Sequence, residues 1–172
     1  MTVISNKPDF NVWFELKTHF EGFYPLAYKD SGGVWTLGFG STYNHKEKRK
    51  VQAGDTISRR EAIEFMQIDA ATVIREINQY ITVPLNPMQM TAICDYVYNR
   101  GIKNMLRTNI DELINSKASA ELICKEIIGT GLRDRLGNLL WGLGRRRRAQ
   151  AWLFFKGQLK LEWNRWEKVI FK

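Results

Sequence analysis

Glycines at positions 32, 33, 38 and 40 constrain this chain more than any other feature, because they interrupt a sequence otherwise patterned for helices. Glycine favours tight turns, and the residues between these positions are mostly β-branched or aromatic, which favours strands. The pattern predicts a small antiparallel β-sheet with tight turns from about residue 26 to residue 57. The charged stretch 44–50 is expected to be a loop.

Helical patterns lie on both sides of this stretch. Apolar residues at helical spacing predict a helix over residues 11–23. A capping box beginning at Ser58 starts a long helix that ends before Pro84, and Pro87 opens a buried central helix. Three further helices are expected over residues 109–114, 118–128 and 144–155.

These elements predict an α+β fold, with a small antiparallel β-sheet lobe and a helical-bundle lobe that carries most of the core. One domain is expected over residues 1–157, with the sheet lobe at about 24–57 and the helical lobe in the rest. Residues 158–172 follow as a basic amphipathic C-terminal extension. A ligand site is expected in a cleft between the two lobes, since sites favour such junctions.

The charge of this 172-residue chain is concentrated at its C-terminal end. Of a formal net charge of +8, a surplus of seven falls between Arg145 and Lys172, which hold nine basic and two acidic residues. A basic surface suits an anionic partner, and charge alone does not choose between a cell envelope and nucleic acid. The run Arg145–Arg148 could bind phosphate, but Arg146 and Arg147 are rather expected to pair with acidic residues across the bundle.

Apolar residues at helical spacing continue past Gly157, at Leu159, Trp163, Trp166 and Ile170. As one stripe of a helix among basic residues, they could contact an anionic membrane. The more ordinary interpretation is that the stripe packs on the domain. The first of these residues also fit the alternation of a strand, so both structures stay open.

The two cysteines and two histidines give little support for a metal or disulfide framework. Cys94 and Cys124 lie in predicted helix interiors and are expected to be buried free thiols. The two histidines, His19 and His45, without paired CxxC motifs leave little basis for a metal site. We therefore expect a mechanism that needs no cofactor.

Three polar residues are candidates for chemistry: Glu21 at the end of the first helix, Asp30 at the entrance of the sheet and Thr36 in a strand. Glycoside hydrolysis needs one carboxyl group that donates a proton and a second group that handles water or the developing cation. Phe20 and Phe23 flank Glu21 and predict apolar surroundings that favour its protonated form. On generic grounds, however, two carboxylates around a hairpin are more often a solvated turn and a helix cap.

The sequence of the segment that holds these three residues resembles the signature of a known family. Residues 19–42, HFEGFYPLAYKDSGGVWTLGFGST, are similar to the signature of the phage-type lysozymes, the muramidases of glycoside hydrolase family 24. The resemblance continues through DTISRREAIEFMQIDAATVIREI (55–77), VPLNPMQMTAICDYVYNRG (83–101) and WGLGRRRRAQAWLF (141–154). It covers about residues 12–157.

The resemblance implies a function and roles for the three candidates. Glu21 would be the general acid, while Asp30, helped by the Thr36 hydroxyl, would hold and activate water. The implied reaction is hydrolysis of the β-1,4 bond between N-acetylmuramic acid and N-acetylglucosamine, with inversion. Some members instead perform a transglycosylation that yields an anhydro sugar, and the presence of all three residues favours hydrolysis.

The implied role is that of an endolysin that lyses the host cell. Residues 1–10 lack the long apolar run of a secretory signal, so we expect accumulation in the host cytoplasm and action in the periplasm or cell wall after holin-dependent release. The expected partner is the glycan strand of peptidoglycan, bound by a monomer, with no nucleic acid. A tail-associated or secreted antibacterial effector and a nucleic-acid-binding protein are the alternatives.

Substrate contacts and two departures from the family pattern complete the expectations. Tyr43, Asn99 and Phe39 are candidates for binding sugars, which pack on aromatic faces and need amide or hydroxyl partners, whereas Tyr28 is expected to be structural. Many family members have His where this chain has Ser41, which removes a possible ion-pair partner. An acidic residue commonly stands where this chain has Gln150, which leaves the preceding arginines without a counterion on their own helix.

Overall fold

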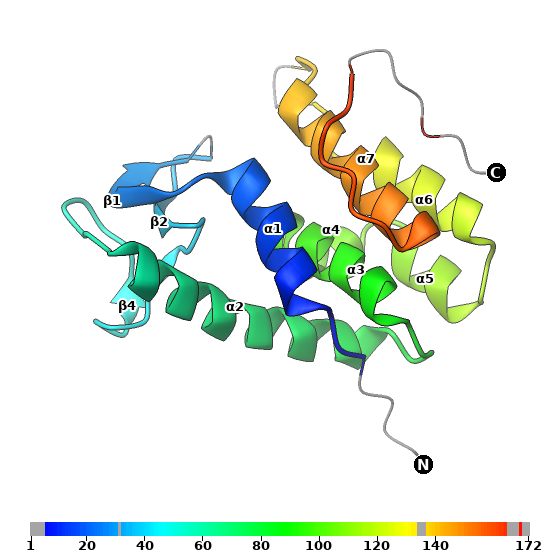
Figure 1. The fold of residues 1–172 in the computed structure, drawn as a ribbon, viewed down its shortest axis with the longest axis horizontal. Helices are drawn as coiled ribbons and strands as arrows, with labels where there is room; N and C mark the ends of the chain where they lie inside the picture. Colours follow the sequence, from blue (N-terminus) through cyan, green and yellow to red (C-terminus); the bar gives the residue numbers. More distant parts are fainter. Residues whose placement is uncertain (1–5, 31, 134–136, 165–168, 170–172) are drawn as a thin grey trace. The chain divides into compact units, whose positions relative to one another are not determined.

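The structure is a computed structural model that describes residues 6–30, 32–133, 137–164 and 169 (Figure 1). The chain divides into two compact units. Unit 1 comprises Met1–Leu16 and Val73–Lys172, and unit 2 comprises Lys17–Thr72. Helices form most of unit 1, whereas unit 2 carries the strands, which confirms the α+β fold class.

Except for a short helix over residues 102–105, which was not predicted, the helices of the described residues begin and end close to the predicted bounds. They are α1 (Phe10–Glu21), α2 (Arg59–Tyr80), α3 (Pro87–Arg100), α4 (Ile102–Met105), α5 (Ile110–Asn115), α6 (Ala120–Gly129) and α7 (Trp141–Lys156). The strands are β1 (Tyr24–Lys29), β2 (Trp35–Gly38), β3 (Tyr43–Asn44) and β4 (Arg49–Lys50). No helix of the described residues is both long and apolar enough to cross a bilayer.

Unit 2 contains two small antiparallel ribbons instead of one sheet. In the first, β1 pairs with β2 so that Tyr28 lies opposite Thr36. In the second, β3 pairs with β4 across the stretch 44–50, so the expected loop is a short hairpin. The charge of Arg49 misled the prediction, because its guanidinium is neutralised by Asp55 at 2.7 Å, a partner outside the charged stretch.

Helix α2 begins with the predicted capping box. The Ser58 backbone N–H donates to Glu61 Oε2 at 2.9 Å, and the Glu61 N–H donates to Ser58 Oγ at 3.2 Å. The hydrogen bonds from Ser58, assisted by Lys46, lower the pKa of the Glu61 carboxyl to about 2. Ser58 and Glu61 are only three residues apart in the sequence, so the sequence pattern could predict where the helix starts.

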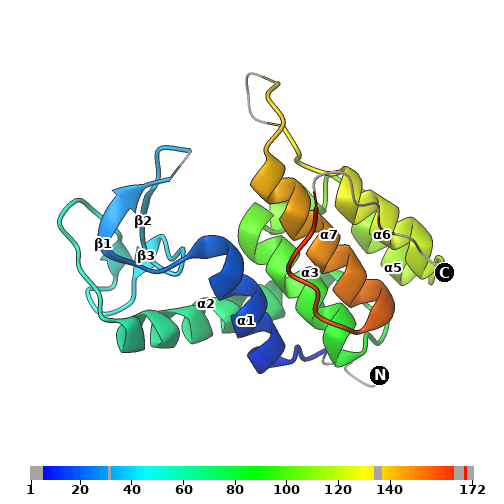
Figure 2. The same cartoon turned by 45° about the horizontal axis from the view of Figure 1, so that its top comes forward.

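Unit 1 is a helical bundle built around α3, α6 and α7. Helix α7 lies beside both α3 and α6 (Figure 2). Cys94 and Cys124 are buried free thiols, as predicted, and the Cys124 thiol donates to the Ala151 carbonyl at 3.2 Å. Burial raises the pKa of Cys124 to about 12.

A buried polar network joins α3 to α7. Arg146 donates from Nε and Nη2 to the two oxygens of Asp95, both at 2.8 Å, which confirms the pairing predicted for this arginine. Gln150 links the network by donating to Asp95 at 2.5 Å and accepting from Arg147 at 2.7 Å. Arg147 has no carboxylate partner among the described residues, contrary to expectation, and its guanidinium lies 4.5 Å from the Tyr96 ring centroid.

The chain after α7 does not continue as a helix. Gly157 adopts a left-handed conformation (φ 67°) that ends α7, and residues 158–164 form no helix or strand. Trp163 is 5% exposed and packs edge-on against Trp152 at 5.9 Å between ring centroids. The predicted stripe therefore packs on the domain at this residue, while Trp166 and Ile170 lie outside the described residues.

Candidate active site

The three predicted catalytic residues all lie in unit 2. Glu21 is the last residue of α1, Asp30 directly follows β1, and Thr36 lies in β2. Glu21 and Asp30 are half-buried, whereas Thr36 is 4% exposed. A helix end and one two-stranded ribbon thus position all three side chains.

Asp30 organises the turn between β1 and β2. Its Oδ1 accepts hydrogen bonds from the N–H groups of Gly32 and Val34, both at 2.8 Å. Gly33 supplies the left-handed backbone that this turn requires, with φ 79°. The Oδ2 atom of Asp30 has no hydrogen-bond partner among the described residues, so one carboxylate oxygen holds the turn and the other is available for chemistry.

The hydroxyl of Thr36 is a hydrogen-bond donor within its own segment of the chain. Its Oγ1 donates to the Val34 carbonyl at 3.0 Å. A hydroxyl has one hydrogen and two lone pairs, so this side chain is left as an acceptor for any further group. Thr36 can therefore accept a hydrogen bond from a water molecule but has no second hydrogen to donate.

Tyr28 links these residues, although the sequence indicated a structural role for it. Its register opposite Thr36 directs both side chains to the same face of the ribbon. Burial raises the pKa of Tyr28, and the nearby carboxyl of Glu21 raises it further. Tyr24 and Asp30 act in the same direction with smaller effects. The charges of both candidate carboxyl groups thus act on the ionisation of Tyr28.

The predicted sugar-contacting aromatic residues in unit 2 have different surroundings. Phe39 is 2% exposed, with its ring 5.3 Å from the Phe23 ring and 5.4 Å from the Arg59 guanidinium. That ring belongs to the core and offers almost no surface to a sugar, so the structure argues against the predicted contact. Tyr43 is 39% exposed and lines a hollow that also includes Trp35.

Asn99 lies in unit 1, near the end of α3. Its Oδ1 accepts a hydrogen bond from Arg147 Nη2 at 2.7 Å. A guanidinium only donates, so this contact fixes which way the amide is oriented. The Nδ2 group of this half-buried residue is consequently directed away from Arg147.

The departure at Ser41 is compensated within unit 2. Ser41 Oγ donates to Asp69 Oδ2 at 2.6 Å, and His45 Nε2 lies 2.7 Å from Asp69 Oδ1. The carboxylate of Asp69 therefore has both a hydroxyl and an imidazole partner. His45 supplies the ring nitrogen that the sequence alone did not locate, because its partner is 24 residues away.

Among the described residues, no group of three or more His, Cys, Asp or Glu side chains could hold a metal ion. The candidate site comprises two carboxyl groups, a hydroxyl and a tyrosine. Two carboxyl groups in different surroundings are the usual equipment of a glycoside hydrolase.

Comparison with known proteins identifies the class to which this site belongs. The family model described as "Phage lysozyme" matches residues 18–150. An endolysin of Acyrthosiphon pisum secondary endosymbiont phage 1 is 34% identical over 140 residues, which cover 78% of this chain and 89% of that relative. This chain belongs to the phage lysozyme family. It is a peptidoglycan-hydrolysing endolysin, as the sequence predicted.

Two further comparisons support the family and the fold, respectively. A SAR-endolysin of Enterobacteria phage PA-2 is 33% identical over 95 residues, which cover 55% of this chain and 54% of that relative. The solved structure of an endolysin from Escherichia coli O157:H7 phage FAHEc1 has a TM-score of 0.77 and 22% identity. That similarity covers 93% of this chain and 97% of the other, and it confirms the fold.

Proposed function

We propose that this endolysin hydrolyses the β-1,4 bond between N-acetylmuramic acid and N-acetylglucosamine with inversion. Glu21 is the general acid, and Asp30 with Thr36 holds the attacking water. The observation that carries this proposal is the arrangement around Tyr28, which lies opposite Thr36 and is influenced by the carboxyl groups of both Glu21 and Asp30.

The hydrogen bonds of Asp30 and Thr36 give the water a specific orientation. One O–H of the water donates to Asp30 Oδ2, since Oδ1 is occupied by the turn. The other donates to Thr36 Oγ1, whose own hydrogen is committed to the Val34 carbonyl. A lone pair of the water is then left to attack the anomeric carbon.

The bond changes follow from this arrangement. The water oxygen bonds to the anomeric carbon as the bond from that carbon to the leaving oxygen breaks. Glu21 gives its proton to the leaving oxygen, and Asp30 takes the proton that the water loses. A single displacement of this kind inverts the anomeric configuration. The reaction requires Glu21 to be protonated and Asp30 to be ionised before each turnover.

Asn99 is proposed as a substrate contact that acts as a hydrogen-bond donor. The orientation enforced by Arg147 leaves the amide N–H groups for a ligand. The carbonyl oxygens of N-acetyl groups and stem peptides are the acceptors that peptidoglycan supplies in quantity. The proposed partner of Asn99 is therefore one of these carbonyl groups.

Glu21→Gln tests the acid assignment most simply. The variant keeps the shape of the side chain and removes its acidic proton, so turnover of purified sacculi should fall about 10²- to 10⁴-fold. The melting temperature should stay at its wild-type value. Thr36→Ser should retain most activity because it keeps the acceptor, and Thr36→Val should lose more. Near-normal turnover by Glu21→Gln would overturn the acid assignment.

Holin-dependent release is part of the proposed function. The similarity to proteins named endolysins supports a role in lysis, and it favours that role over a tail-associated or secreted effector. Expression of the chain in a host with and without a holin tests the route. Lysis should require the holin, and equally fast lysis in its absence would contradict this part of the proposal.

Contact between residues 145–172 and an anionic membrane is a separate proposal, and its support is the local surplus of positive charge. Two of the basic residues, Arg146 and Arg147, are buried and do not contribute to a surface. The ammonium groups of Lys156 and Lys160, by contrast, both lie over the Trp152 ring. Sedimentation of a Lys156→Glu, Lys160→Glu variant with anionic vesicles should show weaker binding, and unchanged binding would exclude the contact.

A further inference from the structure

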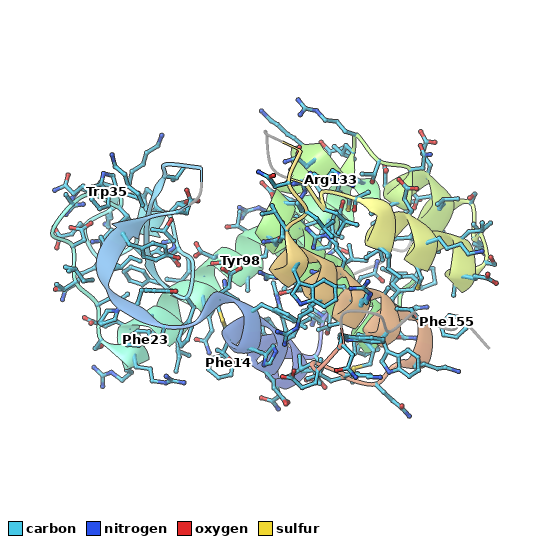
Figure 3. All side chains as sticks on the ribbon, turned by 90° about the horizontal axis from the view of Figure 1, so that it is seen from above. Phe14, Phe23, Trp35, Tyr98, Arg133 and Phe155 are labelled. Carbon is cyan, nitrogen blue, oxygen red and sulfur yellow. The ribbon has the colours of Figure 1, made fainter. Side chains whose placement is uncertain are left out.

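The ribbon that carries Thr36 presents a second face with a different character. Side chains alternate between the two faces of a strand, so the pair Tyr28 and Thr36 points one way and the pair Lys29 and Trp35 points the other. The first pair belongs to the proposed catalytic site. The second pair therefore lies on the reverse face of the same ribbon, and Trp35 is labelled in Figure 3.

A hollow of about 330 Å³ has Trp35 of this reverse face among its lining residues. It is lined entirely by residues of unit 2, from β2, from the β3–β4 hairpin and from the segments next to them: Val34, Trp35, Thr42, Tyr43, Lys50 and Val51. Its volume lies within the range typical of small-ligand sites. Tyr43, which the sequence indicated as a substrate contact, thus lines this hollow together with Trp35, whereas Tyr28 and Thr36 do not line it.

The lining of the hollow combines exposed apolar surface with positive charge. Val34 is 48% exposed and Tyr43 is 39% exposed, so hydrophobic surface around the hollow is open to solvent. Lys50 lines the hollow and is exposed. Lys29 adds a second ammonium group, 5.5 Å from the centroid of the Trp35 ring.

This combination matches the chemistry of the polymer that the enzyme degrades. The apolar faces of sugar rings pack against aromatic rings such as those of Trp35 and Tyr43. The stem peptides of peptidoglycan carry carboxylates, which complement the two lysines. A neutral polysaccharide would leave the lysines without partners, whereas nucleic acid would leave the exposed apolar surface of Val34 unused.

We propose that this reverse-face hollow is a second peptidoglycan-binding site, in which Trp35 and Tyr43 hold an amino-sugar unit and Lys50 with Lys29 binds a stem-peptide carboxylate. The inference rests on the proposed function for the nature of the polymer and deepens it. Because the wall is a continuous network, a second attachment point raises the effective concentration of substrate near the enzyme. The expected consequence is tighter binding to intact wall.

Binding without cleavage is the appropriate measurement, so all variants are made in the Glu21→Gln background. Tyr43→Ala removes an exposed ring, and Lys50→Glu reverses an exposed charge. Their matched controls in unit 1 are Tyr80→Ala, which removes a ring of 41% exposure, and Lys7→Glu, which reverses another exposed lysine. The dissociation constant is measured by sedimentation with purified sacculi.

Two substrates separate the roles of the ring and the charge. Tyr43→Ala should weaken binding about tenfold both to intact sacculi and to glycan from which an amidase has removed the stem peptides. Lys50→Glu should weaken binding to intact sacculi by a similar factor and leave binding to stripped glycan at the control value. Lys50 is exposed, so its variant remains informative even where Tyr43→Ala lowers the melting temperature.

The proposal is overturned if either variant binds intact sacculi as tightly as its own control. This result is distinct from failure of the catalytic assignment. If the catalytic assignment fails, the Glu21→Gln protein itself releases muropeptides, which are detected in the supernatant of the same tubes. Tighter binding by both controls than by both variants, without released muropeptides, supports the two proposals together.

Discussion

Two sets of acidic residues, one in each unit, have different roles. In unit 1, Asp95 and Arg146 are buried at 0% and 4% side-chain exposure and join two helices that are distant in sequence. In unit 2, Asp30 and Asp55 hold local turns through backbone N–H groups. The contrast indicates that buried charge maintains the bundle, while local hydrogen bonds shape the site. Substitutions in the two units should therefore separate stability from activity.

Asp30→Asn should have the largest effect on activity. Asparagine keeps a carbonyl oxygen that can accept from Gly32 and Val34, so the turn is preserved, but it cannot take a proton from water. We expect turnover of sacculi to fall about 10³-fold with little change in melting temperature. Dye release from labelled sacculi and a thermal melt measure the two quantities. A large loss of stability would show that Asp30 is chiefly a turn residue.

Asp95→Ala should have the largest effect on stability. It leaves the buried guanidinium of Arg146 without its carboxylate and removes an acceptor from Gln150, which should cost about 3–5 kcal/mol of the free energy of unfolding. Urea unfolding measures this cost. The control is Glu121→Ala, which breaks an exposed pair with Lys125 and should cost at most about 1 kcal/mol. Equal costs would contradict the contrast between buried and exposed charge.

Asn99→Asp tests whether this residue serves the substrate or only Arg147. A carboxylate still accepts from the Arg147 guanidinium, so stability should be retained, but the N–H donors are lost. We expect KM for soluble muropeptide oligomers to rise about fivefold, which corresponds to one hydrogen bond of about 1 kcal/mol. An unchanged KM with retained stability would assign Asn99 to the buried network alone.

The smallest expected effect is the pH dependence of the stability of the folded state. Hydrogen bonds from Arg49 lower the pKa of Asp55, and those from Ser58 lower the pKa of Glu61 to about 2. Groups with lowered pKa values stabilise the folded state above their unfolded values of about 4, and this stabilisation is lost as the pH falls from about 4 towards 2. Asp55→Asn should therefore lower the melting temperature by a few degrees at pH 7 and by progressively less below pH 4.

Features encoded by neighbouring residues could be predicted from the sequence. The capping box at Ser58, the proline that opens α3 and the buried cysteines each depend on a short pattern. The elements that carry Glu21, Asp30 and Thr36 also followed from local patterns, because a helix end and a glycine turn are short-range features.

Features set by distant partners could not be predicted in the same way. The pairing of Arg49 with Asp55 converts a charged loop into a hairpin, and His45 reaches an acid 24 residues away. Burial of Phe39 depends on Phe23 and Arg59 together, which no periodicity reveals. Residues 158–164 fit a helical pattern but form no helix, since Gly157 ends α7.

The anomeric configuration of the first product tests the mechanism most directly. Proton NMR of a soluble muropeptide oligomer, recorded within the first turnovers, distinguishes the two anomers of the new reducing end before they interconvert. A water held by Asp30 and Thr36 opposite the proton donated by Glu21 predicts the α anomer as the initial product. An initial β anomer, or an anhydro sugar with no reducing end, would contradict the mechanism.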